Sequence, residues 1–188
     1  MIDRLKLPFS FDPTRLKHDL DQLEHLGWTD HFVKQNYEGS WSVIPLRGTA
    51  GATHPIMMIY SDPNATDFED TPFLKASSYF QEVLQGFQCP LESVRLMKLS
   101  AGSVIKEHTD LDLAFEEGHA RLHVPVVTNP EVDFRLNGER VVMLEGECWY
   151  LRLSDPHSVA NRGEADRVHL VIDAIVNPWL KEVFRNNQ

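Results

Sequence analysis

The stretch RLHVPVVTNPEVDFRLNGERVVML, residues 121–144, decides the fold class. It holds three short segments rich in β-branched and other apolar residues, at 121–127, 132–136 and 140–144. The last two are joined by Asn137-Gly138, a dipeptide that tolerates the positive φ angles of a type I′ turn and so predicts a two-residue hairpin. Short strands joined by tight turns are typical of sandwiches, barrels and jelly rolls.

The same pattern continues on both sides of this stretch. Further strands are expected at 94–99, 148–153 and 167–175. Before residue 94 the pattern favours only two short strands, at 41–46 and 56–60. The β-rich part of the chain is therefore its C-terminal half.

Three helices are expected around this β-rich part. The first is capped by Asp12 and ends at Gly27, the second spans about 71–86, and the third begins after Asn177. The sequence therefore predicts an α+β protein of one domain, residues 1–188. We divide it into N-terminal support at 1–93, a jelly-roll core at 94–176 and a C-terminal helix at 177–188.

Composition excludes several classes of function. The 18 basic and 28 acidic residues give a net charge of −10, which disfavours binding to nucleic acid or anionic lipid. No apolar run approaches the roughly 20 residues that span a bilayer, and the N-terminus lacks the features of a signal peptide. We expect a cytoplasmic protein with no nucleic-acid or membrane partner, and the sequence leaves its oligomeric state open.

A candidate metal site begins at His108-Thr109-Asp110. On an extended segment, side chains at positions i and i+2 project to the same side, so both can reach one ion. Two neutral imidazoles and one carboxylate form the facial triad of non-haem Fe(II) oxygenases, which leaves the other face of the metal open. His157, on a distant segment, is the candidate for the third ligand. His-x-Asp alone is weak evidence. In a chain of 188 residues with 9 histidines and 14 aspartates, about 0.7 such triplets are expected by chance, and this chain contains one.

Arg167 adds the evidence that the triplet lacks. It lies ten residues after His157 and begins an apolar strand whose alternation puts Arg167, His169 and Val171 on one face. 2-Oxoglutarate chelates iron through its 2-oxo acid end, and its distal carboxylate then needs a fixed cation. Arginine suits this role because it is always charged and binds a carboxylate through two hydrogen bonds. The alternative is an Arg167 that lies in water or pairs with Asp166 or Asp173.

Arg121 and His123 offer a second pair of donors. They share one face of the strand at 121–127, and both can point into a cavity and bind an anion. The alternative is a partly exposed pair at the edge of the sheet.

Taken together, these motifs resemble the aspartyl/asparaginyl β-hydroxylase and proline hydroxylase family of Fe(II)- and 2-oxoglutarate-dependent oxygenases. The matching stretch runs from about Leu99 to Trp179 and contains five motifs in order: His108-Thr109-Asp110, Arg121-Leu122-His123, Gly146-Glu147-Cys148-Trp149-Tyr150-Leu151, Pro156-His157-Ser158 and Arg167-Val168-His169-Leu170-Val171-Ile172-Asp173. The resemblance implies a double-stranded β-helix, that is, a cupin-like jelly roll with flanking helices and iron at its mouth.

The resemblance also implies roles for single residues. His108, Asp110 and His157 would bind Fe(II), with O2 and 2-oxoglutarate as co-substrates. Arg167 would bind the distal carboxylate of 2-oxoglutarate, and Arg121 with His123 would contact either the co-substrate or the substrate.

The expected activity is that of a dioxygenase that hydroxylates an unactivated C–H bond of an amino acid, either proline-like or Asp/Asn. A free amino acid is favoured because animal peptidyl β-hydroxylases of the family lack the carboxylate ligand that Asp110 provides here. Arg47 or Arg95 is a candidate partner for a free substrate carboxylate. Two alternatives remain: a hydroxylase of Asp, Asn or Pro residues within a peptide, and a jelly-roll protein that binds metal or ligand without catalysis.

Overall fold

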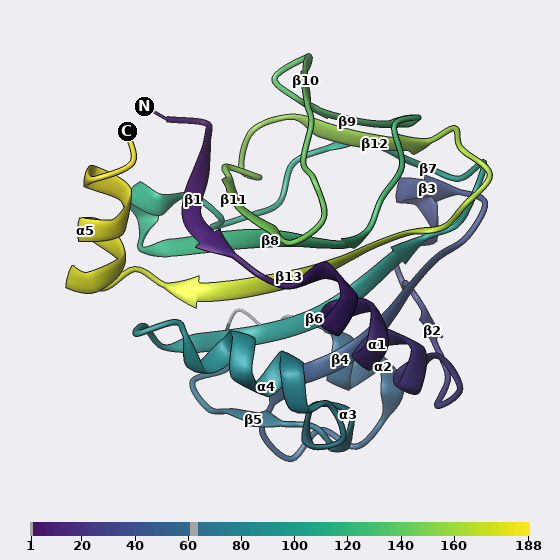
Figure 1. Ribbon diagram of the computed structural model, residues 1–188, viewed down its shortest axis with the longest axis horizontal. Coiled ribbons are helices and arrows are strands. Elements are labelled where there is room, and N and C mark those ends of the chain that lie inside the picture. Colours follow the sequence, from purple (N-terminus) through teal and green to yellow (C-terminus); the bar gives the residue numbers. More distant parts are fainter. Residues whose placement is uncertain (1, 61–63) are drawn as a thin grey trace.

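The computed structural model describes residues 2–60 and 64–188, and its core is formed by two antiparallel sheets (Figure 1). The larger sheet has the order β1 (Arg4–Ser10), β11 (Glu147–Leu151), β8 (His119–Val127), β13 (Arg167–Ile175), β6 (Leu91–Leu99), β4 (Trp41–Thr49), β2 (Thr29–Asp30), with β5 (Phe68–Asp70) also paired to β4. The smaller sheet has the order β10 (Glu139–Val141), β9 (Val132–Leu136), β12 (His157–Asn161), β7 (Val104–His108), β3 (Tyr37–Glu38). This is the expected jelly roll, in which β1 and β4 from the N-terminal part join the larger sheet.

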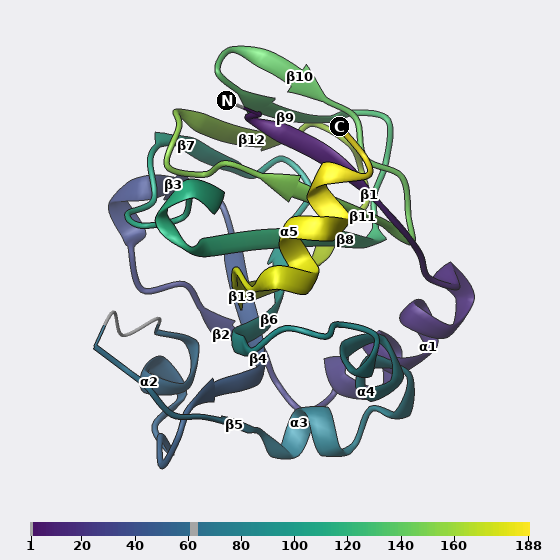
Figure 2. The ribbon, with the colours of Figure 1, turned by 90° about the vertical axis from the view of Figure 1, so that its left-hand side faces the viewer.

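Helices flank the larger sheet, as Figures 1 and 2 show. They are α1 (Pro13–Glu24), α2 (Pro55–Ile59), α3 (Pro72–Lys75), α4 (Ser78–Gln85) and α5 (Pro178–Arg185), with two short 3-10 turns, η1 (Lys34–Asn36) and η2 (Phe115–Glu117). As predicted, Asp12 caps α1 and Asn177 caps α5 through their side-chain oxygens. None of the described helices is long and apolar enough to cross a membrane.

Strand alternation divides the buried side chains into two cores. On β6, Val94 and Leu96 face the helices and pack with the leucines of α1, whereas Met97 and Leu99 face the smaller sheet. The strands β8 and β13 alternate in the same way. One face of the three central strands is therefore directed to the space between the sheets, where polar side chains meet.

Two predictions of secondary structure were wrong. Residues 56–59 lie in helix α2 and not in a strand, because Pro55 starts the helix and the imidazole of His54 accepts a hydrogen bond from the backbone N–H of Ile56. The single helix expected at 71–86 is two helices, α3 and α4. The buried carboxylate of Asp19, from α1, accepts hydrogen bonds from the backbone N–H groups of Tyr79 and Phe80, so it starts α4 as a new helix.

The predicted hairpin is confirmed. Asn137 and Gly138 have φ angles of 53° and 78°, and they join β9 to β10. β10 ends at Val141, three residues before the expected end of its strand.

Candidate active site

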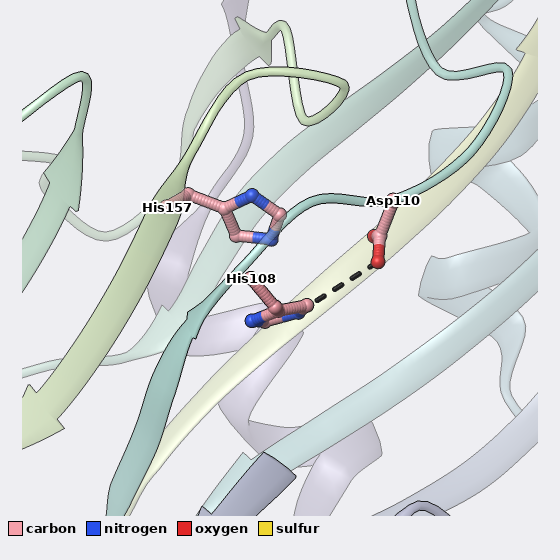
Figure 3. Close-up of side chains that lie close together, drawn as sticks. All are labelled: His108, Asp110 and His157. Atoms are coloured by element: carbon pink, nitrogen blue, oxygen red, sulfur yellow. Dashed lines mark ion pairs between the residues drawn. The ribbon is translucent and has the colours of Figure 1, made fainter.

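The smaller sheet brings the three predicted metal ligands together. β7 and β12 are antiparallel neighbours in which His108 and His157 lie directly opposite each other, and Asp110 follows the end of β7. One ligand atom from each of the three side chains lies within 4.8 Å of the others (Figure 3). Between two of these side chains, Asp110 Oδ1 lies 3.7 Å from His108 Nε2. His157 was expected on a distant strand, and β12 is that strand, whereas β7 was not among the predicted strands; both are needed for this arrangement.

Hydrogen bonds fix the tautomers of both histidines. Nδ1 of His108 lies 2.7 Å from the carbonyl oxygen of Lys106, and Nδ1 of His157 lies 3.0 Å from that of Asp155. A carbonyl oxygen can only accept, so each Nδ1 carries the proton and each Nε2 keeps its lone pair. Burial also lowers the pKa of His157, which favours the neutral ring. The candidate donor set is therefore two imidazole nitrogens and one carboxylate, which are close enough together to bind one metal ion.

A cavity of about 620 Å³ opens beside these ligands. All six residues singled out in the sequence line it, namely His108, Asp110, Arg121, His123, His157 and Arg167. Arg95 also lines it, whereas Arg47 donates to the carbonyl oxygens of Leu91 and Phe68 and pairs with Asp70. The residues predicted from separate motifs thus share one cavity.

Arg167 is buried without a carboxylate partner among residues 2–60 and 64–188. It is 2% exposed, and burial lowers its pKa to about 9. Asp166 accepts instead from the backbone N–H of Ala101, and Asp173 binds two other arginines. Since a buried charge is costly unless it is paired, this guanidinium is suited to an anion that enters the cavity.

The two other arginines share the carboxylate of Asp173. Arg95 donates to Asp173 Oδ2 at 2.6 Å, and Arg121 donates to Oδ1 at 2.6 Å and to Oδ2 at 2.9 Å. Burial disfavours the charge of Asp173, but Arg121 and Arg95 keep its pKa below the usual range. Arg121 also donates to Asp110 Oδ2 at 2.6 Å, so it connects Asp110 to this cluster.

Two lining residues were missed as site residues in the sequence. Asp173 was considered only as a partner for Arg167, although its place at the end of an apolar strand was a signal. His31 was not singled out at all. Its ring stacks on Trp41 with centroids 3.6 Å apart, and burial together with the charge of Arg95 lowers its pKa to about 4. No sequence pattern brings His31 to the cavity, because only tertiary packing places it there.

Comparison with known proteins identifies the family of the chain. The family model described as aspartyl/asparaginyl β-hydroxylase matches residues 14–177. The chain belongs to this family. Within it, the chain is 28% identical over 178 residues to L-proline cis-4-hydroxylase of Rhizobium meliloti (strain 1021), covering 94% of this chain. The chain spans 62% of the length of that relative.

Solved structures confirm the fold of this member of the β-hydroxylase family. The 2-oxoglutarate-dependent epimerase SnoN from nogalamycin biosynthesis superposes with a TM-score of 0.58 at 10% identity, over 92% of this chain and 77% of that one. The viral collagen prolyl hydroxylase of Paramecium bursaria Chlorella virus-1 gives a TM-score of 0.54 at 9% identity, over 93% and 97%. At these identities the likeness concerns the fold alone.

Proposed function

We propose that this protein is an Fe(II)- and 2-oxoglutarate-dependent dioxygenase that hydroxylates a C–H bond of a free amino acid. One observation carries the proposal. A His-Asp-His donor set shares its cavity with two separate cationic positions, one at Arg167 and one at the pair Arg95 and Arg121. A metal site alone would need neither position.

The donor set fits Fe(II). Two neutral imidazoles and one carboxylate suit this ion and leave part of its coordination sphere for other ligands. His108, Asp110 and His157 would hold the metal, and Arg121 would orient Asp110 through its second oxygen. When bound, iron and 2-oxoglutarate supply the chemistry by which O2 oxidises a C–H bond.

Arg167 would bind the distal carboxylate of 2-oxoglutarate. Its guanidinium is buried, faces the cavity and has no carboxylate partner among the described residues. A bidentate carboxylate would satisfy the charge and also Nε, which is buried without a hydrogen-bond partner. His123, which lines the same cavity, would lie beside the co-substrate.

Charge balance at the second position supports a free amino acid. Arg95 and Arg121 carry two positive charges, and Asp173 supplies one negative charge, whereas the charge of Asp110, which also binds Arg121, would be balanced by Fe(II). One positive charge is left, which one substrate carboxylate would neutralise. The relative of known activity is a hydroxylase of L-proline, so a proline-like amino acid is the first candidate and Asp or Asn the next.

A hydroxylase of residues within a peptide is the second candidate. The cavity is bordered by three exposed apolar side chains, Phe32, Tyr60 and Leu111, and Leu111 is 88% exposed. Such a rim would also suit a peptide. A Pro or Asn residue within a peptide, however, has no free carboxylate for the surplus charge at Arg95 and Arg121, and an Asp residue has only that of its side chain.

The test is succinate formation with Fe(II), 2-oxoglutarate and a panel of L-proline, L-aspartate and L-asparagine, each also supplied with its α-carboxylate blocked as the amide. We expect succinate and a product 16 Da heavier from one free amino acid, and at most a weak response from its amide. An equal or stronger response to the amides or to short peptides would favour the second candidate. The variant His157→Ala serves as the inactive control.

A further inference from the structure

A polar side chain to which the proposed function gives no role lies beside both cavity residues of the co-substrate position. His169, on β13, is 1% exposed. Its Nδ1 lies 2.8 Å from a terminal nitrogen of Arg167 and 3.3 Å from Nδ1 of His123. One nitrogen atom therefore contacts the two residues that face the distal end of the co-substrate.

The chemistry of the three side chains fixes the direction of both hydrogen bonds. Arginine can only donate, so Nδ1 of His169 accepts and its proton is on Nε2. His123 must then donate through its own Nδ1, which leaves its Nε2 with the lone pair. That Nε2 atom is buried and has no partner among the described residues. His169 thus selects one tautomer of His123 as well as one orientation of Arg167.

An irregularity in the sheet places His169 for these contacts. Pro125 lies opposite His169 on β8, and the register between the two strands shifts at Val168 and His169. Proline has no N–H to donate to a neighbouring strand, and such irregularities redirect side chains. The position is therefore built by Pro125 and not by regular alternation alone.

We infer that His169 is a positioning residue, which holds Arg167 and His123 in the arrangement that binds the distal carboxylate of 2-oxoglutarate. The inference rests on the proposed function and adds a residue to it. Arg167 has one side-chain hydrogen-bond partner among the described residues, and that partner is His169. A charge-assisted hydrogen bond changes an equilibrium constant by about tenfold or more, so its loss is measurable as weaker binding.

Two variants separate this role from simple core packing. His169→Leu keeps an apolar side chain of moderate size but has no acceptor. His169→Asn places an amide oxygen at about the position of the imidazole Nδ1, so it keeps the acceptor in a smaller side chain. If packing alone mattered, the smaller Asn would disturb the protein more than Leu.

The measurement is calorimetric affinity for two ligands on Mn(II)-loaded protein without O2. 2-Oxoglutarate has both the chelating end and the distal carboxylate, whereas 2-oxobutyrate has only the chelating end. We expect His169→Leu to bind 2-oxoglutarate about tenfold or more weakly and 2-oxobutyrate as the wild type does, while His169→Asn stays within about threefold of the wild type for both.

Equal affinities of the wild type and His169→Leu for 2-oxoglutarate would overturn the inference, as would an equal loss for both ligands. If the wild type itself bound 2-oxoglutarate no better than 2-oxobutyrate, the co-substrate assignment of the proposed function would fail first. If His169→Leu does not fold, His169→Gln replaces it. Its amide lies one bond further from the backbone, so it should show the same selective loss.

Discussion

Replacement of Arg167 by methionine should make the ligand-free protein more stable and the co-substrate site weaker. Methionine has a similar length, fills most of the same space and carries no charge. Arg167 is buried without a carboxylate partner among the described residues, so the folded protein bears the cost of its desolvation. The same charge is what an entering carboxylate would need.

The magnitude of the stability change follows from the pKa of Arg167. Burial lowers it from the usual range of an arginine to about 9. A lowered pKa of a base means that the folded state disfavours the protonated form, and at pH 7 this cost is fully present because the pH lies below both values. At about 1.36 kcal/mol per pKa unit the upper bound is roughly 5 kcal/mol. Lost packing and the hydrogen bond to His169 reduce the gain, so we expect an increase of about 1–3 kcal/mol in the free energy of unfolding.

The effect on binding has the opposite sign. Removal of one partner of a buried ion pair costs about 3–5 kcal/mol, so the affinity for 2-oxoglutarate should fall at least about a hundredfold. Urea denaturation of the ligand-free protein and calorimetry with 2-oxoglutarate measure the two quantities. Arg185→Met, at an arginine on the protein surface, is the matched control and should change both very little. A destabilised Arg167→Met protein with wild-type affinity would refute the reasoning.

Three further predictions concern other residues of the cavity. Asp110→Ala should weaken Mn(II) binding by more than about tenfold in a metal titration. The reason is that loss even of a residue that only orients a ligand commonly lowers metal affinity by that factor. An unchanged affinity would place the metal elsewhere. Arg95→Met should raise the KM for the amino acid by about tenfold or more and leave that for 2-oxoglutarate unchanged, and the reverse pattern in steady-state kinetics would exchange the two anion positions. His31 has its pKa lowered to about 4 by burial and by Arg95, so the unfolded chain takes up this proton first as pH falls below about 6.5. The stability contributed by neutral His31 is thus present above pH 6.5 and lost towards pH 4, and at pH 5 the loss in the free energy of unfolding is about 2 kcal/mol. Urea denaturation should therefore show that His31→Gln loses less stability between pH 7 and pH 5 than the wild type does. An identical loss in both proteins would contradict the burial argument.

Much of the fold could be predicted from local patterns. Alternation and the Asn137-Gly138 turn predict the strands at the centre of the jelly roll, and Asp12 and Asn177 mark two helix starts correctly. The errors have tertiary causes. The break between α3 and α4 depends on Asp19, about 60 residues earlier in the chain, and no local pattern can show that contact.

The candidate site divides in the same way. The sequence alone predicts the candidate ligands His108, Asp110 and His157 together with Arg167, because their motifs occur in order along the chain. The cluster of Arg95, Arg121 and Asp173 depends on strand register. Asp173 is paired with Arg121 across β8 and β13, whereas Arg95 reaches it from β6 on the other side. Sequence alternation predicts on which face of a strand each side chain lies, but it does not predict which strands are neighbours. The surplus charge of this cluster therefore follows only from the three-dimensional structure.

The proposed reaction couples oxidation of a free amino acid to that of 2-oxoglutarate by O2. It can be tested under ¹⁸O2 with Fe(II), 2-oxoglutarate and the amino acid that gives succinate, by mass spectrometry of both products. We expect one ¹⁸O atom in the hydroxylated amino acid, one in succinate, and equal amounts of the two compounds. A hydroxyl oxygen derived from water, or hydroxylation without succinate, would contradict it.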